Sequence, residues 1–168
     1  MERTSPLYTV CGQRFRIRKL LGHGKGGWSW LAEKDGVQYV LKQIHHEPCD
    51  YYSFGDKIRA EQNDYQRLKQ ADIRIPEMFL CDMERERIVK EYISGETIHS
   101  LVQDRISVEP YFEQVREMAA KAKAAGFNID YYPTNFVVHD GLLWYIDYEC
   151  SSYSEEWNFE NWGIQYWK

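Results

Sequence analysis

The sequence predicts an α+β fold in which a five-stranded antiparallel sheet with one helix is followed by a shorter, mainly helical part. Three early segments carry the first half of this prediction. Residues 14–21 alternate polar and apolar side chains, as a half-buried strand does. The Asp35-Gly36 dipeptide, a strong hairpin signal, separates two further strands at 28–33 and 37–44.

The helical part of the prediction rests on capping signals as well as on apolar spacing. Asp56 and Ser107 are side chains that cap helix N-termini, and Gly126 is a typical helix terminator. The remaining predicted elements are a helix over 56–70, strands over 77–82 and 86–93, and helices over about 97–104 and 108–125. A hairpin over 136–146 follows them.

Composition limits the classes of function. The chain has 168 residues with 21 basic and 26 acidic side chains, a net charge of −5, which argues against nucleic-acid binding. The four cysteines are far apart and form no CxxC pair, so we expect free thiols in a reducing compartment. The N-terminus lacks the apolar core of a signal peptide, and no run is apolar enough for a membrane. We therefore expect a cytoplasmic protein with no membrane partner.

A glycine-rich stretch at residues 21–31 contains Gly22, Gly24 and Gly27 in a G-x-G-x-x-G spacing. A dinucleotide-binding fingerprint would continue into a helix, whereas here an aromatic, strand-like segment follows. A Walker-type loop is excluded because a glycine follows Lys25. A glycine-rich hairpin that leads to a strand lysine is typical of a phosphate-covering loop, although a plain surface hairpin has the same spacing.

Two charged residues fall where apolar side chains are expected. Lys42 lies between Val40 and Ile44 on one face of its strand. Glu61 falls within the apolar stripe of the predicted helix 56–70, where a carboxylate is costly unless it is paired. We predict a Lys42–Glu61 ion pair; the alternative is that Lys42 extends to solvent and Glu61 lies at the wet edge of the stripe.

The densest polar cluster surrounds the hairpin near the C-terminus. Asp130 and Asn135 precede its first strand, and Asp147 follows its second, so the hairpin brings Asn135 and Asp147 to the same end. Oxygen-bearing side chains of this kind suit Mg²⁺, with one carboxylate left to handle a proton or a hydroxyl. Each residue alone is also common in loops and caps.

Over about residues 15–149 the chain resembles the protein-kinase-like superfamily. The matching segments, in chain order, are Leu21-Gly22-His23-Gly24 to Gly27, Val40-Leu41-Lys42, Glu61, Val89 to Gly95, Asp130 with Asn135, and Ile146-Asp147-Tyr148. The resemblance implies one domain over residues 1–168, with an N-lobe over about 1–93, a hinge over 91–96 and a reduced C-lobe over 97–168.

The resemblance also implies roles for these residues in binding ATP and Mg²⁺. The backbone of Gly22, Gly24 and Gly27 would cover the phosphates, and Lys42, held by Glu61, would reach the α- and β-phosphates. The backbone at Glu91 and Tyr92 would bind adenine, with Val40 against the adenine pocket. Asn135 and Asp147 would hold Mg²⁺, and Asp130 would orient the acceptor hydroxyl.

The chain departs from the family pattern in several places. Asn128 and Ile129 replace the histidine and arginine of the catalytic loop, and only nineteen residues follow Glu149. Residues 146–153 are similar to choline kinases and aminoglycoside phosphotransferases. We therefore expect a miniature kinase that phosphorylates a hydroxyl of a protein Ser/Thr or of a small molecule, with a partner protein or a dimer completing the short C-lobe. A pseudokinase that binds nucleotide or a partner, and an unrelated α+β domain, are the alternatives.

Overall fold

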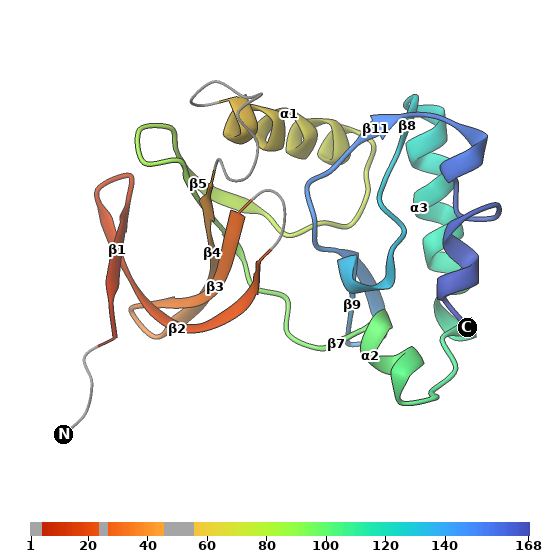
Figure 1. Ribbon diagram of the computed structural model, residues 1–168, viewed down its shortest axis with the longest axis horizontal. Helices are drawn as coiled ribbons and strands as arrows, with labels where there is room; N and C mark the ends of the chain where they lie inside the picture. The colour runs from red at the N-terminus through yellow and green to blue at the C-terminus, as the bar shows by residue number, and fades with distance from the viewer. Residues whose placement is uncertain (1–4, 24–26, 46–55) are drawn as a thin grey trace. The chain divides into compact units, whose positions relative to one another are not determined.

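The structure, a computed structural model, describes residues 5–23, 27–45 and 56–168 (Figure 1). It consists of two compact units. The first contains residues up to 62 together with 77–92, and the second contains residues 63–76 and 93–168. In the described part of the chain, no helix is long and apolar enough to cross a bilayer.

The first unit is built on a six-stranded antiparallel sheet with the order β1-β2-β3-β4-β6-β5. Its strands are β1 (Leu7–Val10), β2 (Gln13–His23), β3 (Gly27–Lys34), β4 (Val37–Ile44), β5 (Met78–Asp82) and β6 (Arg87–Glu91). The long strand β2 bends around the sheet, as Figure 1 shows, and its pairing with β3 shifts register twice. Such bulges increase local twist, which explains the curl of the sheet.

The predicted five-stranded sheet is therefore wrong by one strand. The additional strand is β1, which pairs with β2 through a two-residue turn at Cys11 and Gly12. Both residues have left-handed backbone, with φ of 48° and 78°. Glycine adopts this conformation readily but cysteine rarely does, so the sequence at this turn is not a recognisable hairpin signal.

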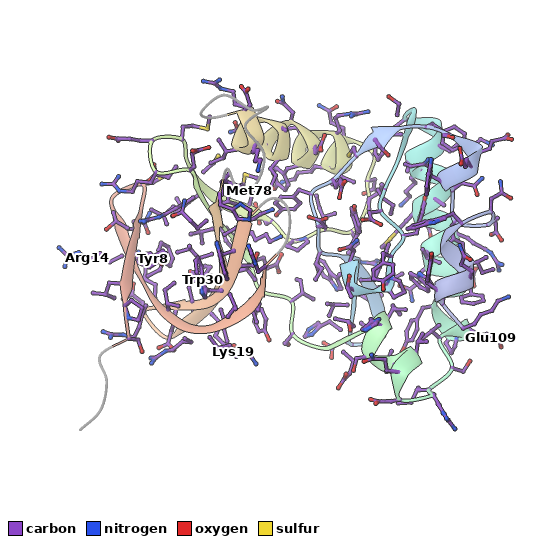
Figure 2. All side chains as sticks on the ribbon, in the orientation of Figure 1. Tyr8, Arg14, Lys19, Trp30, Met78 and Glu109 are labelled. Atoms are coloured by element: carbon purple, nitrogen blue, oxygen red, sulfur yellow. The ribbon has the colours of Figure 1, made fainter. Side chains whose placement is uncertain are left out.

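The core of the first unit lies on the two faces of this sheet. One cluster of buried residues consists of Val10, Phe15, Ile17, Ala32, Leu41 and Val89. Tyr8 and Trp30, labelled in Figure 2, pack against this cluster, and their rings meet edge to face at 5.3 Å. A second cluster joins Ile44 and Ile88 of the sheet to Ile58 of helix α1 (Asp56–Gln70). The helix predicted over 56–70 is thus confirmed.

The second unit mixes short strands with helices, so the prediction of a mainly helical second part is also wrong. Its helices are α2 (Ile98–Gln103) and α3 (Phe112–Ala124), with 3₁₀ turns at Glu109–Tyr111, Pro133–Asn135, Glu155–Trp157 and Gly163–Tyr166. Its strands are β7 (Glu96–Thr97), β8 (Phe127–Asn128), β9 (Phe136–His139), β10 (Leu142–Tyr145) and β11 (Ser151–Ser152). They form one sheet in the order β10-β9-β7 and a separate β8–β11 pair.

An aromatic core holds the loop that carries Asp130. Tyr131 is buried, and its ring contacts those of Phe136 and Phe159. The indole N–H of the buried Trp167 donates to the carbonyl oxygen of Tyr131 at 2.8 Å. This packing anchors the backbone next to Asp130 from the C-terminal end of the chain.

Candidate functional site

The charged residues predicted in the first unit form an ion pair. Lys42 on β4 donates from its Nζ to Oε1 of Glu61 on α1, and the two side chains are only 12% and 14% exposed. Strand β4 pairs with β3 and β6 on both sides, so Lys42 projects from an interior strand. The predicted pair is confirmed; because each charge offsets the cost of burying the other, it holds an ammonium group at a fixed, largely dehydrated position.

The glycines of the predicted phosphate loop have different structural requirements. A Cβ at Gly27 would collide with the backbone carbonyl of Gln43, so the close pairing of β3 with β4 requires glycine there. A Cβ at Gly22 would meet nothing within 4 Å, and its φ is not in the left-handed region. The fold therefore explains Gly27 but not Gly22. Gly24 lies outside the described residues.

Of the residues predicted to bind adenine, Glu91 is the last residue of β6, Tyr92 follows it, and Val40 lies in the middle of β4. The backbone N–H of Glu91 donates to the carbonyl oxygen of Glu77 at 2.8 Å, so this amide is already used within the fold. Tyr92 follows β6 directly and is half-buried. Val40 on β4 is also half-buried, opposite Leu31 of β3. Their roles in binding adenine remain predictions.

In the second unit, the loop and the hairpin bring the predicted polar residues together. The side chain of Asn135 donates to the carbonyl oxygen of Asp130 at 3.3 Å. The carbonyl oxygen of Asn135 accepts the backbone N–H of Ile146 at 2.9 Å, immediately before Asp147. Asn135 and Asp147 therefore lie at the same end of the β9–β10 hairpin, as the sequence predicts.

Tyr145 is a central residue that the sequence analysis missed. Its side chain is fully buried, and its hydroxyl accepts the backbone N–H of Asp130 and donates to the carbonyl oxygen of Glu149, each at 3.0 Å. It thus connects the Asp130 loop to the segment after Asp147. Burial, reinforced by the nearby carboxylates, raises the pKa of Tyr145 far above its usual value, so the hydroxyl stays protonated as this bridge requires.

Two further acidic residues belong to the same cluster. Partial burial, followed by repulsion from Asp147 and then Asp130, raises the pKa of Glu149 to about 7. Oδ2 of Asp64 accepts the backbone N–H of Cys150 at 3.1 Å, and burial raises the pKa of Asp64 as well. No strong sequence signal marks Asp64, because only the tertiary fold brings it to the hairpin, whereas Glu149 lies two residues after Asp147 in the sequence.

The acidic cluster has the chemistry of a hard-cation site. Carboxylate and amide oxygens are the ligands that Mg²⁺ prefers. Burial is the largest cause of the raised pKa of Glu149, and repulsion from Asp147 and Asp130, which a cation would relieve, adds to it. Within the described ranges, however, no group of three or more His, Cys, Asp or Glu side chains is arranged to hold a metal ion. Asn135 and Asp147 therefore remain proposed ligands, which would be completed by water and substrate oxygens.

A small cavity of about 230 Å³ lies elsewhere in the second unit. It is lined by Ser107, Val108, Glu109, Phe112, Trp167 and Lys168. None of the predicted site residues lines it, so it contributes nothing to the candidate site.

Comparison with known proteins found no family model that matches the chain. The sequence is 25% identical over 118 residues to a protein of Methanospirillum hungatei named as a probable bifunctional tRNA threonylcarbamoyladenosine biosynthesis protein. The match covers 70% of this chain but 21% of that relative, so the chain spans about a fifth of the relative's length.

This comparison corrects the function predicted from the sequence. The name of the relative points to tRNA modification, not to a kinase that phosphorylates proteins or small molecules, nor to a pseudokinase. The physical reason for the error is that lysine, glutamate and aspartate at these spacings indicate where phosphates and a cation can bind, but they do not specify the reaction that follows.

Proposed function

We propose that this chain takes part in the biosynthesis of threonylcarbamoyladenosine in tRNA, as a part that binds ATP with Mg²⁺. The Lys42–Glu61 pair is the observation that carries the proposal, since a largely buried ammonium on an interior strand is well suited to phosphate recognition. The name and the partial coverage of the Methanospirillum relative support the link to tRNA modification.

Each unit contributes a defined set of residues to this proposal. In the first unit, Lys42 would neutralise phosphate charge, and Gly22 would leave room for a phosphate near the backbone, because the fold does not require glycine there. In the second unit, Asn135 and Asp147 would hold Mg²⁺, which screens phosphate charge when it is bound. Asp130 would orient the group that reacts with the nucleotide.

The net charge of the chain bears on whether it binds tRNA directly. A net charge of −5 opposes binding to a polyanion, since proteins that bind nucleic acids neutralise phosphates with clusters of lysine and arginine. We therefore propose that a protein partner binds the tRNA and that this chain supplies the nucleotide. This division agrees with a chain that matches only 21% of a relative named as bifunctional.

Nucleotide binding is tested by calorimetric titration of the chain with ATP and MgCl₂. We expect Lys42→Met to weaken ATP binding at least about tenfold, because it removes a charge-assisted contact to phosphate. Lys19→Met is the matched control: Lys19 (Figure 2) is an exposed lysine on the same sheet, and its loss should leave affinity unchanged. Equal ATP affinity of both variants would contradict the role of Lys42. Because Lys42→Met also leaves Glu61 without its partner, melting curves must show that this variant is folded at the temperature of the titration.

The link to tRNA is tested separately in cells depleted of this chain. We expect the content of threonylcarbamoyladenosine in digested tRNA, measured by mass spectrometry, to fall and to recover with the wild-type gene but not with Lys42→Met or Asp147→Asn. An unchanged content in depleted cells would overturn the proposed pathway while leaving nucleotide binding intact.

A further inference from the structure

Two imidazole rings face each other at the edge of the first unit, outside the residues assigned above. His23 is the last residue of β2, and His45 follows directly after the last residue of β4. Their Nε2 atoms lie 3.2 Å apart, and their ring centroids are separated by 5.1 Å with the planes inclined at 58°. One ring nitrogen from the end of β2 and one from the residue after β4 thus lie within contact distance of each other.

The separation of the two nitrogens matches that of two ligands on one metal ion. Imidazole nitrogens bind zinc at about 2.0–2.1 Å, so two of them at an angle between octahedral and tetrahedral lie roughly 2.9–3.4 Å apart. The observed 3.2 Å falls within this interval. A metal ion could therefore replace the direct contact between the two rings with little rearrangement of the backbone.

Neighbouring groups hold both histidines in position. The ring of His23 stacks on Trp28 of β3, with centroids 3.6 Å apart and planes inclined at 5°. His23 and Trp28 are also paired across the β2–β3 ladder. On the other side, Nζ of Lys57 donates to the backbone carbonyl of His45 at 2.7 Å. The stacking fixes the plane of the His23 ring, and the hydrogen bond from Lys57 fixes the backbone of His45.

We propose that His23 and His45 form a binding site for a late first-row transition-metal ion such as Ni²⁺, Zn²⁺ or Cu²⁺. Neutral imidazole selects these ions over Mg²⁺, which prefers oxygen ligands, so this site is chemically distinct from the acidic cluster of the second unit. The described residues add no third His, Cys, Asp or Glu ligand. Water or a small exogenous ligand completes the coordination, and binding is reversible.

The experiment uses the full chain without an affinity tag, titrated with NiCl₂ in the absence of nucleotide. Calorimetry should give one site, and tryptophan fluorescence should be quenched because Trp28 stacks on a ligand ring. His23→Gln and His45→Gln should each weaken Ni²⁺ binding at least about tenfold, by loss of one of two ligands. Trp28→Phe should keep the site but lose most of the quenching.

Matched histidine variants make the test specific. His139→Gln and His99→Gln remove histidines of the second unit and should leave Ni²⁺ affinity unchanged. His46→Gln controls for the adjacent histidine in the sequence. The proposal is overturned if the wild-type chain does not bind Ni²⁺, if His23→Gln binds as tightly as the wild type, or if only His46→Gln abolishes binding.

Discussion

The two units of this protein both collect charged side chains, but they balance the charges differently. In the first unit, Lys42 and Glu61 neutralise each other in a largely buried pair. In the second unit, burial first, and then repulsion from Asp147, Asp130 and Asp64, raises the pKa of Glu149, so like charges are gathered there. Neutral groups, chiefly the Tyr145 hydroxyl and the Asn135 amide, hold the backbone of this acidic cluster.

The difference separates an arrangement in which each charge is compensated from one in which like charges repel. A buried pair is strongly destabilised when one partner is removed, because the other charge is left without compensation. A cluster of like charges gains when one member is removed, since repulsion is relieved. Groups kept in such an unfavourable arrangement are typical of functional sites, which is why the second unit is where we place a cation.

The largest effect is expected from breaking the ion pair of the first unit. Glu61→Ala should lower the free energy of unfolding by roughly 3 kcal/mol, because it leaves the ammonium of Lys42 buried without its carboxylate. The double variant Lys42→Met/Glu61→Leu should recover most of this loss, since it removes both charges together. Urea denaturation of the three proteins measures the difference; a double variant less stable than Glu61→Ala would show that the pair is not the cause.

The next largest loss of stability is expected from substituting a glycine of the first unit. Gly27→Ala should cost about 2 kcal/mol, because its methyl group would press against the carbonyl of Gln43 and separate β3 from β4. Gly22→Ala has open space and should leave stability within about 0.5 kcal/mol of the wild type. Thermal melts compare the two variants, and an equal loss in both would refute the assignment of a structural role to Gly27 alone.

Removing a charge from the acidic cluster should not lower the free energy of unfolding, in contrast to removing one from the ion pair. Asp147→Asn should leave the unfolding free energy at pH 8 equal to the wild type or higher by up to about 0.5 kcal/mol, because it removes a repulsive charge. A clear loss of stability, as large as that of Glu61→Ala, would contradict the view that this cluster is unfavourable without a cation.

The same variant should flatten the pH dependence of stability. The pKa of Glu149 is about 7 in the folded chain, against an ordinary 4.5, so between these values the folded state holds a proton that the unfolded state has released. Stability therefore falls as pH rises through this window. Asp147→Asn lowers the pKa of Glu149 and should make the fall shallower in urea titrations from pH 4.5 to 8.

Two thiols provide the finest comparison of the units. Burial first, and then nearby acidic groups, raises the pKa of Cys81 to about 11 and that of Cys150 to about 12. Glu61 is among the groups acting on Cys81, and Asp64 among those acting on Cys150. Glu61→Gln should therefore speed iodoacetamide labelling of Cys81 a few-fold and leave Cys150 unchanged, and Asp64→Asn should do the reverse.

Peptide mass spectrometry resolves the labelling rates at each cysteine. The exposed Cys11 serves as an internal reference. Its labelling rate should not change in Asp64→Asn. Parallel acceleration of Cys81 and Cys150 in one variant would indicate general loosening of the fold instead of a local electrostatic effect.

Local patterns in the sequence were sufficient for much of this protein. Lys42 and Glu61 each fall among apolar positions, of a strand and of a helix, and this predicted their ion pair. The hairpin near the C-terminus predicted that Asn135 and Asp147 lie together. Helix α1 was predicted with its observed limits, and the β3–β4 hairpin was recognised from its Asp35-Gly36 turn. These predictions are correct because the periodicity of the backbone decides which face of a helix or strand a side chain occupies, independently of tertiary contacts.

Only the tertiary structure decided the rest. Strand β1 and the two-residue strands β7, β8 and β11 are too short, or too unusual in their turns, to show a period of two. The bridge made by Tyr145, the proximity of Asp64 to Cys150 and the meeting of His23 with His45 join residues distant in the chain. A pattern along the sequence predicts which face a side chain occupies, but packing between elements determines which partner it meets there.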